Sequence, residues 1–187
     1  KSIDGGLSWT QVLGAPVLGP NSRGTDLELA ANGDLYASIG FFSQGRIYKS
    51  TASIHGINTG NTGTWEDITP DPFTNQIPLA NNSDAYDRIE LATAPNNANI
   101  MYAIFEGNGT QNAGYIKQYD GLSNLWSSKA VPTIIDQGDN SNFTRGQAWY
   151  DLIAAVDPNN ADRFYIGGVD ALRSDNAGTS WSQKTTW

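Results

Sequence analysis

The sequence contains no cysteine and only one histidine, His55, among its 187 residues. The absence of cysteine excludes disulfide bonds, thiolate metal ligands and a cysteine nucleophile. A single histidine disfavours both a zinc site built on several imidazoles and a Ser-His-Asp triad. No apolar run approaches the ~20 residues of a membrane-spanning helix, and no signal peptide is visible. We therefore expect no cofactor, no metal site and no insertion into a membrane.

Charge is also scarce, because only 16% of the residues are Asp, Glu, Lys or Arg. Acidic residues outnumber basic ones by 19 to 11, which gives a formal net charge of −8. Nucleic-acid binding would require clustered Lys and Arg, so we do not expect this protein to bind nucleic acid. The negative charge also disfavours binding to an anionic membrane surface. Glycine (20 residues) and aromatic residues (11%) are plentiful instead. Such a composition is typical of an all-β protein with many tight turns.

The chain contains an internal repeat. Tryptophans recur at intervals of about 55–60 residues, a period within the range of structural repeats, at Trp9, Trp65, Trp126 and Trp181. Short strand-like segments with a central tyrosine recur with them, at 34–38, 100–104 and 163–167. Two of these segments follow Pro-Asn-Asn corners, a turn signal because proline fixes φ and asparagine tolerates the left-handed region.

Each unit of the repeat contains four segments of strand composition. We predict strands at 25–31, 34–39, 45–50 and 64–69, at 87–93, 100–105, 114–119 and 124–128, and at 149–156, 163–167, 171–174 and 179–184. No segment shows a sustained helical spacing of apolar residues, so we predict essentially no helix. Four antiparallel strands per period of this length are typical of β-propeller blades. We expect an all-β partial propeller with the end of a preceding blade at 1–14 and blades at 24–69, 86–129 and 149–184.

Three blades and one extra hairpin do not close a ring, because propellers have about 4–8 blades. We therefore expect the chain to be part of a larger propeller. Either the remaining blades belong to the same chain, or a second copy completes the ring, or the units stack without closing.

Two of the turns that precede tryptophan share the pattern Ser-x-Asp/Asn-x-Gly-x-Ser-Trp. Its residues are Ser2, Asp4, Gly6, Ser8 and Trp9 in one turn and Ser174, Asn176, Gly178, Ser180 and Trp181 in the other. The Asp or Asn can accept hydrogen bonds from its own turn, and glycine adopts positive φ without a Cβ penalty. We expect both tryptophans to form large apolar plates between neighbouring hairpins, and we interpret all ten residues as structural.

This pattern resembles the Asp-box, or BNR repeat, of bacterial sialidases, sortilin-like receptors, xyloglucan-cleaving glycosidases and many secreted bacterial surface proteins. The stretch 147–181 especially looks like repeats of large exported Bacteroidetes proteins. The turn before Trp65 departs from the pattern through an insertion after Ser50, and the turn at 120–126 is degenerate. The resemblance implies a β-propeller, and it does not specify an activity because the motif occurs on enzymes and binding proteins alike.

A candidate ligand site follows from the expected propeller, in which the first strand of each blade lines the axis. Aligned by unit, three charged residues lead into these strands, namely Asp26, Arg88 and Asp151. They are flanked by Arg145, Trp149 and Tyr150. Charges and aromatic rings that converge on an axis can bind a polar ligand such as a sugar. In the alternative interpretation the charged residues pair with each other or with water and only stabilise the entrance of the central channel.

No catalytic set is recognisable. The resemblance to sialidases would require three clustered arginines and a Tyr–Glu nucleophile pair, and glycosidases in general need two carboxylates about 5–10 Å apart. Asp26 with Asp151 or Asp87 is the best pair available, and nothing in the spacing selects it. The acidic loop 136–142 lacks the EF-hand pattern, so we interpret it as solvated rather than as a calcium site.

These observations favour a non-catalytic, exported bacterial propeller segment that binds glycans or proteins at a cell surface. One alternative is part of a glycoside hydrolase, sialidase-like or xyloglucanase-like, whose catalytic residues lie partly outside this chain. The other is a structural spacer in a large surface protein. The sequence does not decide among them.

Overall fold

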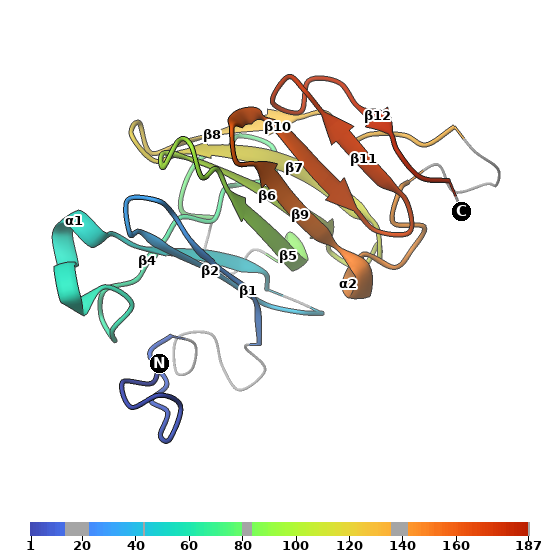
Figure 1. Cartoon of the computed structure of the whole chain (residues 1–187). Helices are drawn as coiled ribbons and strands as arrows, with labels where there is room; N and C mark the ends of the chain where they lie inside the picture. The colour runs from blue at the N-terminus through green and yellow to red at the C-terminus, as the bar shows by residue number, and fades with distance from the viewer. Residues whose placement is uncertain (14–22, 43, 80–83, 136–141, 187) are drawn as a thin grey trace.

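The computed structural model describes residues 1–13, 23–42, 44–79, 84–135 and 142–186. They form three four-stranded antiparallel sheets whose strands follow one another in chain order (Figure 1). We call these sheets blades 1, 2 and 3. Within the described ranges, no helix is long and apolar enough to span a membrane. The predicted all-β, blade-by-blade architecture is confirmed.

The strands of each blade pair with their sequence neighbours. Blade 1 contains β1 (Gly24–Leu29), β2 (Leu35–Ile39), β3 (Arg46–Ser50) and β4 (Glu66–Asp67). Blade 2 contains β5 (Tyr86–Thr93), β6 (Ile100–Gly107), β7 (Ala113–Asp120) and β8 (Leu125–Lys129). Blade 3 contains β9 (Ile153–Asp157), β10 (Asn160–Gly167), β11 (Ala171–Ser174) and β12 (Ser182–Gln183). All twelve predicted strands are present, although the outermost strands of blades 1 and 3 are only two residues long.

The expectation of essentially no helix is confirmed, and the exceptions among the described residues are single turns at two places. The insertion after Ser50 folds into the single turns α1 (Ala52–His55) and η1 (Gly56–Asn58). A third turn, α2 (Ala148–Asp151), replaces the start of the strand predicted at 149–156. The Gln147 carbonyl forms α2 by accepting the backbone N–H groups of residues 150 and 151. A single turn is too short to have an apolar face that packs on the core, so it gives no helical spacing of apolar residues in the sequence.

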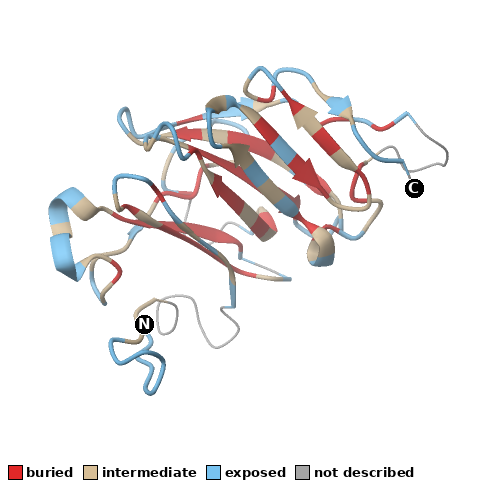
Figure 2. Cartoon of the chain, in the orientation of Figure 1, coloured by how far each residue is buried: buried red, intermediate tan, exposed pale blue. Residues whose placement is uncertain are grey.

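The blades stack face to face and enclose two apolar cores. β1 contacts β5, and β5 contacts β9, so the first strand of each blade lies beside the first strand of the next blade. Tyr36 of β2 packs edge-on against Tyr119 of blade 2, and Tyr102 of β6 stacks at 3.9 Å on Phe164 of blade 3. Both tyrosines are buried, and buried residues concentrate on the strands between the blades (Figure 2).

The recurring tryptophans occupy equivalent positions and connect the blades. The indole of Trp126 donates to the Ile68 carbonyl of blade 1 at 2.7 Å, and the indole of Trp181 donates to the Ala130 carbonyl of blade 2 at 2.7 Å. Trp9 does not form the predicted plate, because 75% of it is exposed. Its indole donates within its own turn instead, since no described sheet covers this hairpin.

The two motif turns contain the local hydrogen bonds that the sequence predicts. The Ser174 hydroxyl accepts the Gly178 N–H at 2.8 Å, and the Asn176 side chain accepts the Ser180 N–H at 2.9 Å. The turn at 2–9 repeats both bonds at 2.8 and 2.9 Å. Ser50 plays the same part despite the insertion, because its hydroxyl accepts the Gly60 N–H at 2.9 Å.

Candidate functional site

Four aromatic side chains form one surface patch where blades 1 and 3 approach each other. This aromatic patch consists of Phe41, Phe42, Trp149 and Tyr150. Its ring centroids are 4.2 Å apart between the two phenylalanines, 6.3 Å from Phe42 to Trp149 and 5.5 Å from Trp149 to Tyr150. Phe42 is 63% exposed and Tyr150 is 70% exposed. The patch therefore presents aromatic surface to solvent from the β2–β3 turn, through Phe42, and from α2, through Tyr150.

Arg88 fixes α2 and the start of β9 against blade 2. Its guanidinium donates to the main-chain carbonyls of Tyr150 and, at 3.0 Å, Leu152. It also pairs with Glu90 at 3.1 Å within β5, where both side chains are largely buried. This guanidinium thus satisfies backbone acceptors of the next blade and holds the helical turn that carries half of the aromatic patch.

Asp26 connects blades 1 and 2 in a similar way. One of its carboxylate oxygens accepts the Leu91 N–H of β5 at 2.7 Å, and the other accepts the Leu27 N–H at 2.7 Å. On the same face of β1, Glu28 accepts the backbone N–H and the hydroxyl of Thr93 at 3.2 and 2.8 Å. These carboxylates bind backbone groups of a neighbouring strand that has no partner strand on that side.

The predicted alignment of Asp26 with Arg88 and Asp151 is wrong by two residues. The residue opposite Asp26 lies two positions after the central tyrosine of β2, and the residue opposite Glu90 lies two positions after the central tyrosine of β6. Asp26 therefore corresponds to Glu90, whereas Arg88 and Asp151 remain equivalent. The connection between the first two strands is two residues shorter in blade 1 than in blade 2, because Leu27 pairs with Ala37 whereas Leu91 pairs with Ala103.

Two other predicted residues, Arg145 and Asp151, precede the first strand of blade 3. Arg145 pairs with the fully buried Asp170 at 3.0 Å. Asp151 ends α2, and one of its carboxylate oxygens is buried without a hydrogen-bond partner among the described residues. Burial raises the pKa of Asp151, and the nearby Arg88 opposes that rise.

Sequence reasoning missed a group of buried carboxyls around Arg88. Burial raises the pKa of Glu90 to about 7, with a further increase from Asp26 and an opposing effect of Arg88. Burial also raises the pKa of Glu106 to about 7. The pKa of Asp87 is raised by burial and lowered by the Gly109 N–H that its carboxylate accepts at 2.8 Å. Glu90 and Glu106 therefore titrate near neutral pH, which is a property of general acids and also of tightly buried structural carboxyls.

The structure thus brings Arg88, Tyr150 and Asp151 together and places Trp149 beside them, while Asp26 lies on the neighbouring innermost strand and Arg145 pairs inside blade 3. Phe42 was missed, although two consecutive aromatic residues in a Gly-Phe-Phe-Ser-Gln-Gly turn are a usable signal. Within the described ranges, no group of three or more Asp, Glu or His side chains could hold a metal ion. Most of the acidic loop 136–142 lies outside the described residues.

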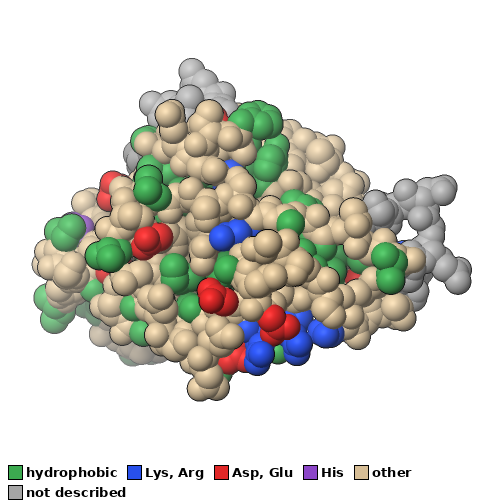
Figure 3. Space-filling model, turned by 90° about the horizontal axis from the view of Figure 1, so that it is seen from above, with side chains coloured by type: hydrophobic (Ala, Val, Ile, Leu, Met, Phe, Trp, Pro, Cys, Tyr) green, Lys and Arg blue, Asp and Glu red, His purple; other side chains and the backbone are tan. Residues whose placement is uncertain are grey.

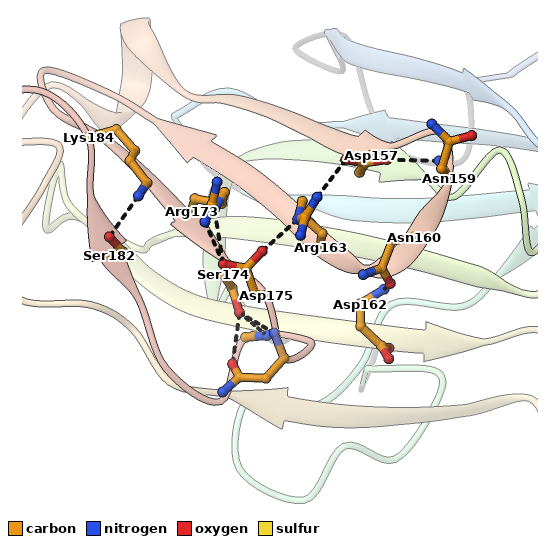
Figure 4. A network of polar contacts seen from close by, with 12 residues as sticks. Asp157, Asn159, Asn160, Asp162, Arg163, Arg173, Ser174, Asp175, Ser182 and Lys184 are labelled. Atoms are coloured by element: carbon orange, nitrogen blue, oxygen red, sulfur yellow. Dashed lines mark hydrogen bonds and ion pairs between the residues drawn. The ribbon is translucent and has the colours of Figure 1, made fainter.

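A separate polar cluster covers the outer face of blade 3. Arg163 lies between Asp157 and Asp175, at 3.4 and 2.5 Å, and Arg173 pairs with Asp175 at 2.8 Å (Figure 4). Seen from above, opposite charges also gather side by side along one edge of the molecule (Figure 3). Exposed ion pairs of this kind contribute little stability, and they keep a sheet face soluble.

The sequence matches no known protein family and no curated protein. The fold is similar to that of a GH74 enzyme from Niastella koreensis, with a TM-score of 0.61 and 20% identity over 96% of this chain and 26% of the enzyme. It is also similar to a GH74 xyloglucanase from Xanthomonas campestris, with a TM-score of 0.56 and 18% identity over 92% of this chain and 23% of the enzyme. The chain therefore spans about a quarter of the length of these proteins, and the likeness establishes the β-propeller fold alone.

Proposed function

We propose that the chain is a segment of an exported bacterial β-propeller that binds a glycan on the aromatic patch. The observation that carries this proposal is the row of rings from Phe42 through Trp149 to Tyr150, which is contributed by two different blades and is open to solvent. Aromatic faces are electron-rich, so they attract the polarised C–H groups on the apolar face of a sugar ring. A few fixed polar groups beside such rings then set the orientation of the ligand.

The rigidity of this surface supports the proposal. Arg88 bonds to the backbone on both sides of Asp151, and these bonds hold α2 against blade 2. Preorganised rings lose little conformational entropy on binding. We therefore assign ligand contact to Phe42, Trp149 and Tyr150 and inter-blade positioning to Arg88 and Asp26. The motif turns are proposed to be Asp-boxes with a purely structural role.

The net charge of −8 favours a neutral ligand over an anionic one, because a negative protein field repels anions such as sialic acid. Neutral β-glucan oligosaccharides are the best candidates. The fold similarity to a xyloglucanase makes xyloglucan oligosaccharides the first ligands to test.

The decisive experiment is calorimetric titration with xyloglucan and cellulose oligosaccharides, with sialyllactose as the anionic comparison. Trp149→Ala and Tyr150→Ala are expected to weaken binding about tenfold or more, as removal of a central aromatic contact does. Phe73→Ala is the matched control, since Phe73 is 82% exposed on a different loop. Equal affinity in all three variants would contradict the proposed site. Absence of binding to every glycan would favour a protein ligand or the spacer alternative.

A second candidate is a part of a glycoside hydrolase. The fold similarity to two GH74 enzymes and the carboxyl pKa values of about 7 favour it, because a general acid works best with a pKa near the working pH. Release of reducing ends from xyloglucan would support hydrolysis, and its loss in Glu90→Gln or Glu106→Gln with binding retained would identify a catalytic carboxyl. Binding without turnover would support the non-catalytic function.

A further inference from the structure

The outer face of blade 1, which points away from blade 2, is apolar and open. Leu27 and Leu29 of β1 are each 65% exposed on it. Leu91 of β5 is equivalent to Leu27, because each of them pairs with the residue that follows the central tyrosine of the next strand. Leu91 is only 1% exposed, since blade 1 covers it. The same position is therefore a core position wherever a preceding blade is present.

A buried donor on this face lacks a partner. The indole N–H of Trp65 is buried and has no hydrogen-bond acceptor among the described residues. The equivalent indoles of Trp126 and Trp181 each donate at 2.7 Å to a main-chain carbonyl of the preceding blade. An unsatisfied buried N–H costs about 1–3 kcal/mol, so such a group requires an explanation.

The segment nearest to this indole has the geometry of the outer hairpin of a blade. Lys1 and Thr10 are joined by a backbone hydrogen bond of 2.9 Å, and the turn between them repeats the hydrogen bonds of the turn at 174–181 in blade 3. The Lys1 ammonium donates at 2.7 Å to the side chain of Asn61, in the turn that precedes Trp65. Residues 1–13 therefore resemble the outermost part of a sheet next to blade 1.

The acceptor for the Trp65 indole can be located from the repeat. The carbonyls that accept from Trp126 and Trp181 lie three and four residues after the tryptophan of the preceding blade. Counted from Trp9, these positions are Val12 and Leu13. Both residues line a cavity of about 330 Å³ together with Leu27 and Trp65, so the tryptophan and the two residues that carry its expected acceptors already border the same space.

We propose that the outer face of blade 1 is the docking surface for one further four-stranded blade of this repeat, whose outer hairpin is Lys1–Leu13. In the docked arrangement the Trp65 indole donates to the carbonyl of Val12 or Leu13. The apolar face of that blade covers Leu27 and Leu29.

A second copy of the chain fits this surface less well. The other outer blade face, on blade 3, carries the ion pairs of Arg163 and Arg173 with their aspartates (Figure 4). Packing these charges against Leu27 and Leu29 would remove them from water without new partners. The occupant is therefore a blade with an apolar face, and not the charged face of blade 3.

The absence of cysteine allows a direct test on the full-length protein. Leu27→Cys and Leu29→Cys each introduce a single thiol on the docking surface, and Leu122→Cys introduces one at a site that is 82% exposed in the β7–β8 turn. The rate of maleimide labelling reports how accessible each thiol is. We expect Leu27→Cys and Leu29→Cys to label about tenfold or more slowly than Leu122→Cys, as covered sites do.

Three results would overturn the proposal. Equal labelling at all three sites means that the surface is open. Protection that disappears on dilution, together with the molar mass of a dimer, means that a second copy covers it. An indole N–H of Trp65 that exchanges with solvent as fast as that of Trp9 means that the proposed hydrogen bond is absent. The melting temperatures of the variants are measured in parallel, because an unfolded variant would label rapidly at any site.

Discussion

The indole of Trp126 donates a hydrogen bond of 2.7 Å to the main-chain carbonyl of Ile68, and this bond crosses from blade 2 to blade 1. The Trp126 ring is only 6% exposed and contacts the rings of Phe105 and Tyr119. One side chain therefore fills the core of its own blade and satisfies a backbone group of its neighbour. The recurrence of tryptophan in the sequence reflects this double role.

Replacement of Trp126 with alanine should be among the most destabilising substitutions in blade 2. We expect a loss of about 3–5 kcal/mol in the free energy of unfolding, from the cavity and the unpaired carbonyl. Trp126→Phe retains most of the packing and should cost about 1–2 kcal/mol. Leu122→Ala is the control, with a change within about 0.5 kcal/mol at an exposed position. Urea denaturation measures all three, and a loss as small as the control in Trp126→Ala would contradict the buried role.

The contribution of the first serine of each turn to the stability of the protein should increase with the burial of that turn. Ser174→Ala removes the acceptor of the Gly178 N–H in a buried turn, so we expect a loss of about 1–3 kcal/mol. Ser50→Ala should behave similarly, because the Gly60 N–H is buried as well. In the exposed turn at 2–9, water can replace the Ser2 hydroxyl, and Ser2→Ala should change stability by less than about 0.5 kcal/mol. Equal effects of Ser2→Ala and Ser174→Ala in denaturation curves would refute this explanation.

The parts of the fold that could be predicted from the sequence are those encoded by neighbours along the chain. The turn residues Ser174 and Asn176 bond within their own turn, and Gly178 has the positive φ of 79° that favours glycine. The central tyrosines lie in short, mostly apolar runs, which are typical of strands buried on both faces. These features recur in the sequence because each blade contains the same strands and the same kind of turn.

The features that could not be predicted depend on contacts between distant residues. Strand pairing shows that the β1–β2 connection is two residues shorter than the β5–β6 connection, so Asp26 does not align with its predicted counterparts. The aromatic patch joins Phe42 to Trp149 across more than half the chain. The raised carboxyl pKa values arise from burial between blades, which has no local signature in the sequence. The candidate site was therefore less predictable than the fold that supports it.

Arg88 should contribute to the docking of blade 3 on blade 2. Arg88→Met leaves two backbone carbonyls and the partly buried Glu90 without their cationic donor. We expect a loss of about 2–4 kcal/mol in the free energy of unfolding. Arg88→Lys keeps the charge but not the planar fork, so its effect should be intermediate. Hydrogen exchange at the backbone amides of α2 and β9 should accelerate in Arg88→Met, and unchanged exchange there would show that other contacts hold blade 3.

The stability of the protein should fall as the pH rises from about 4.5 to about 7. Burial raises the pKa of Glu90 and of Glu106 from the ordinary value of 4.5 to about 7, so the folded state binds more protons than the unfolded state in this window. A raised carboxyl pKa gives stability that is complete below the unfolded pKa and is lost as the pH rises through the folded pKa. Lys117 acts in a different window, because burial lowers its pKa to about 8 and its effect lies between that pH and its ordinary value of 10.5.

Each buried glutamate should contribute about 1–3 kcal/mol to this pH dependence, which urea denaturation at pH 5, 6, 7 and 8 measures. Glu106→Gln preserves an acceptor for the Arg88 N–H and removes the ionisation, so its slope of stability against pH should be roughly halved. Glu66→Gln is the control, since Glu66 lies exposed at the edge of blade 1 and should leave the slope unchanged. A wild-type stability that is constant or rising between pH 5 and 7 would mean that Glu90 and Glu106 are ionised at a lower pH than their burial between the blades requires.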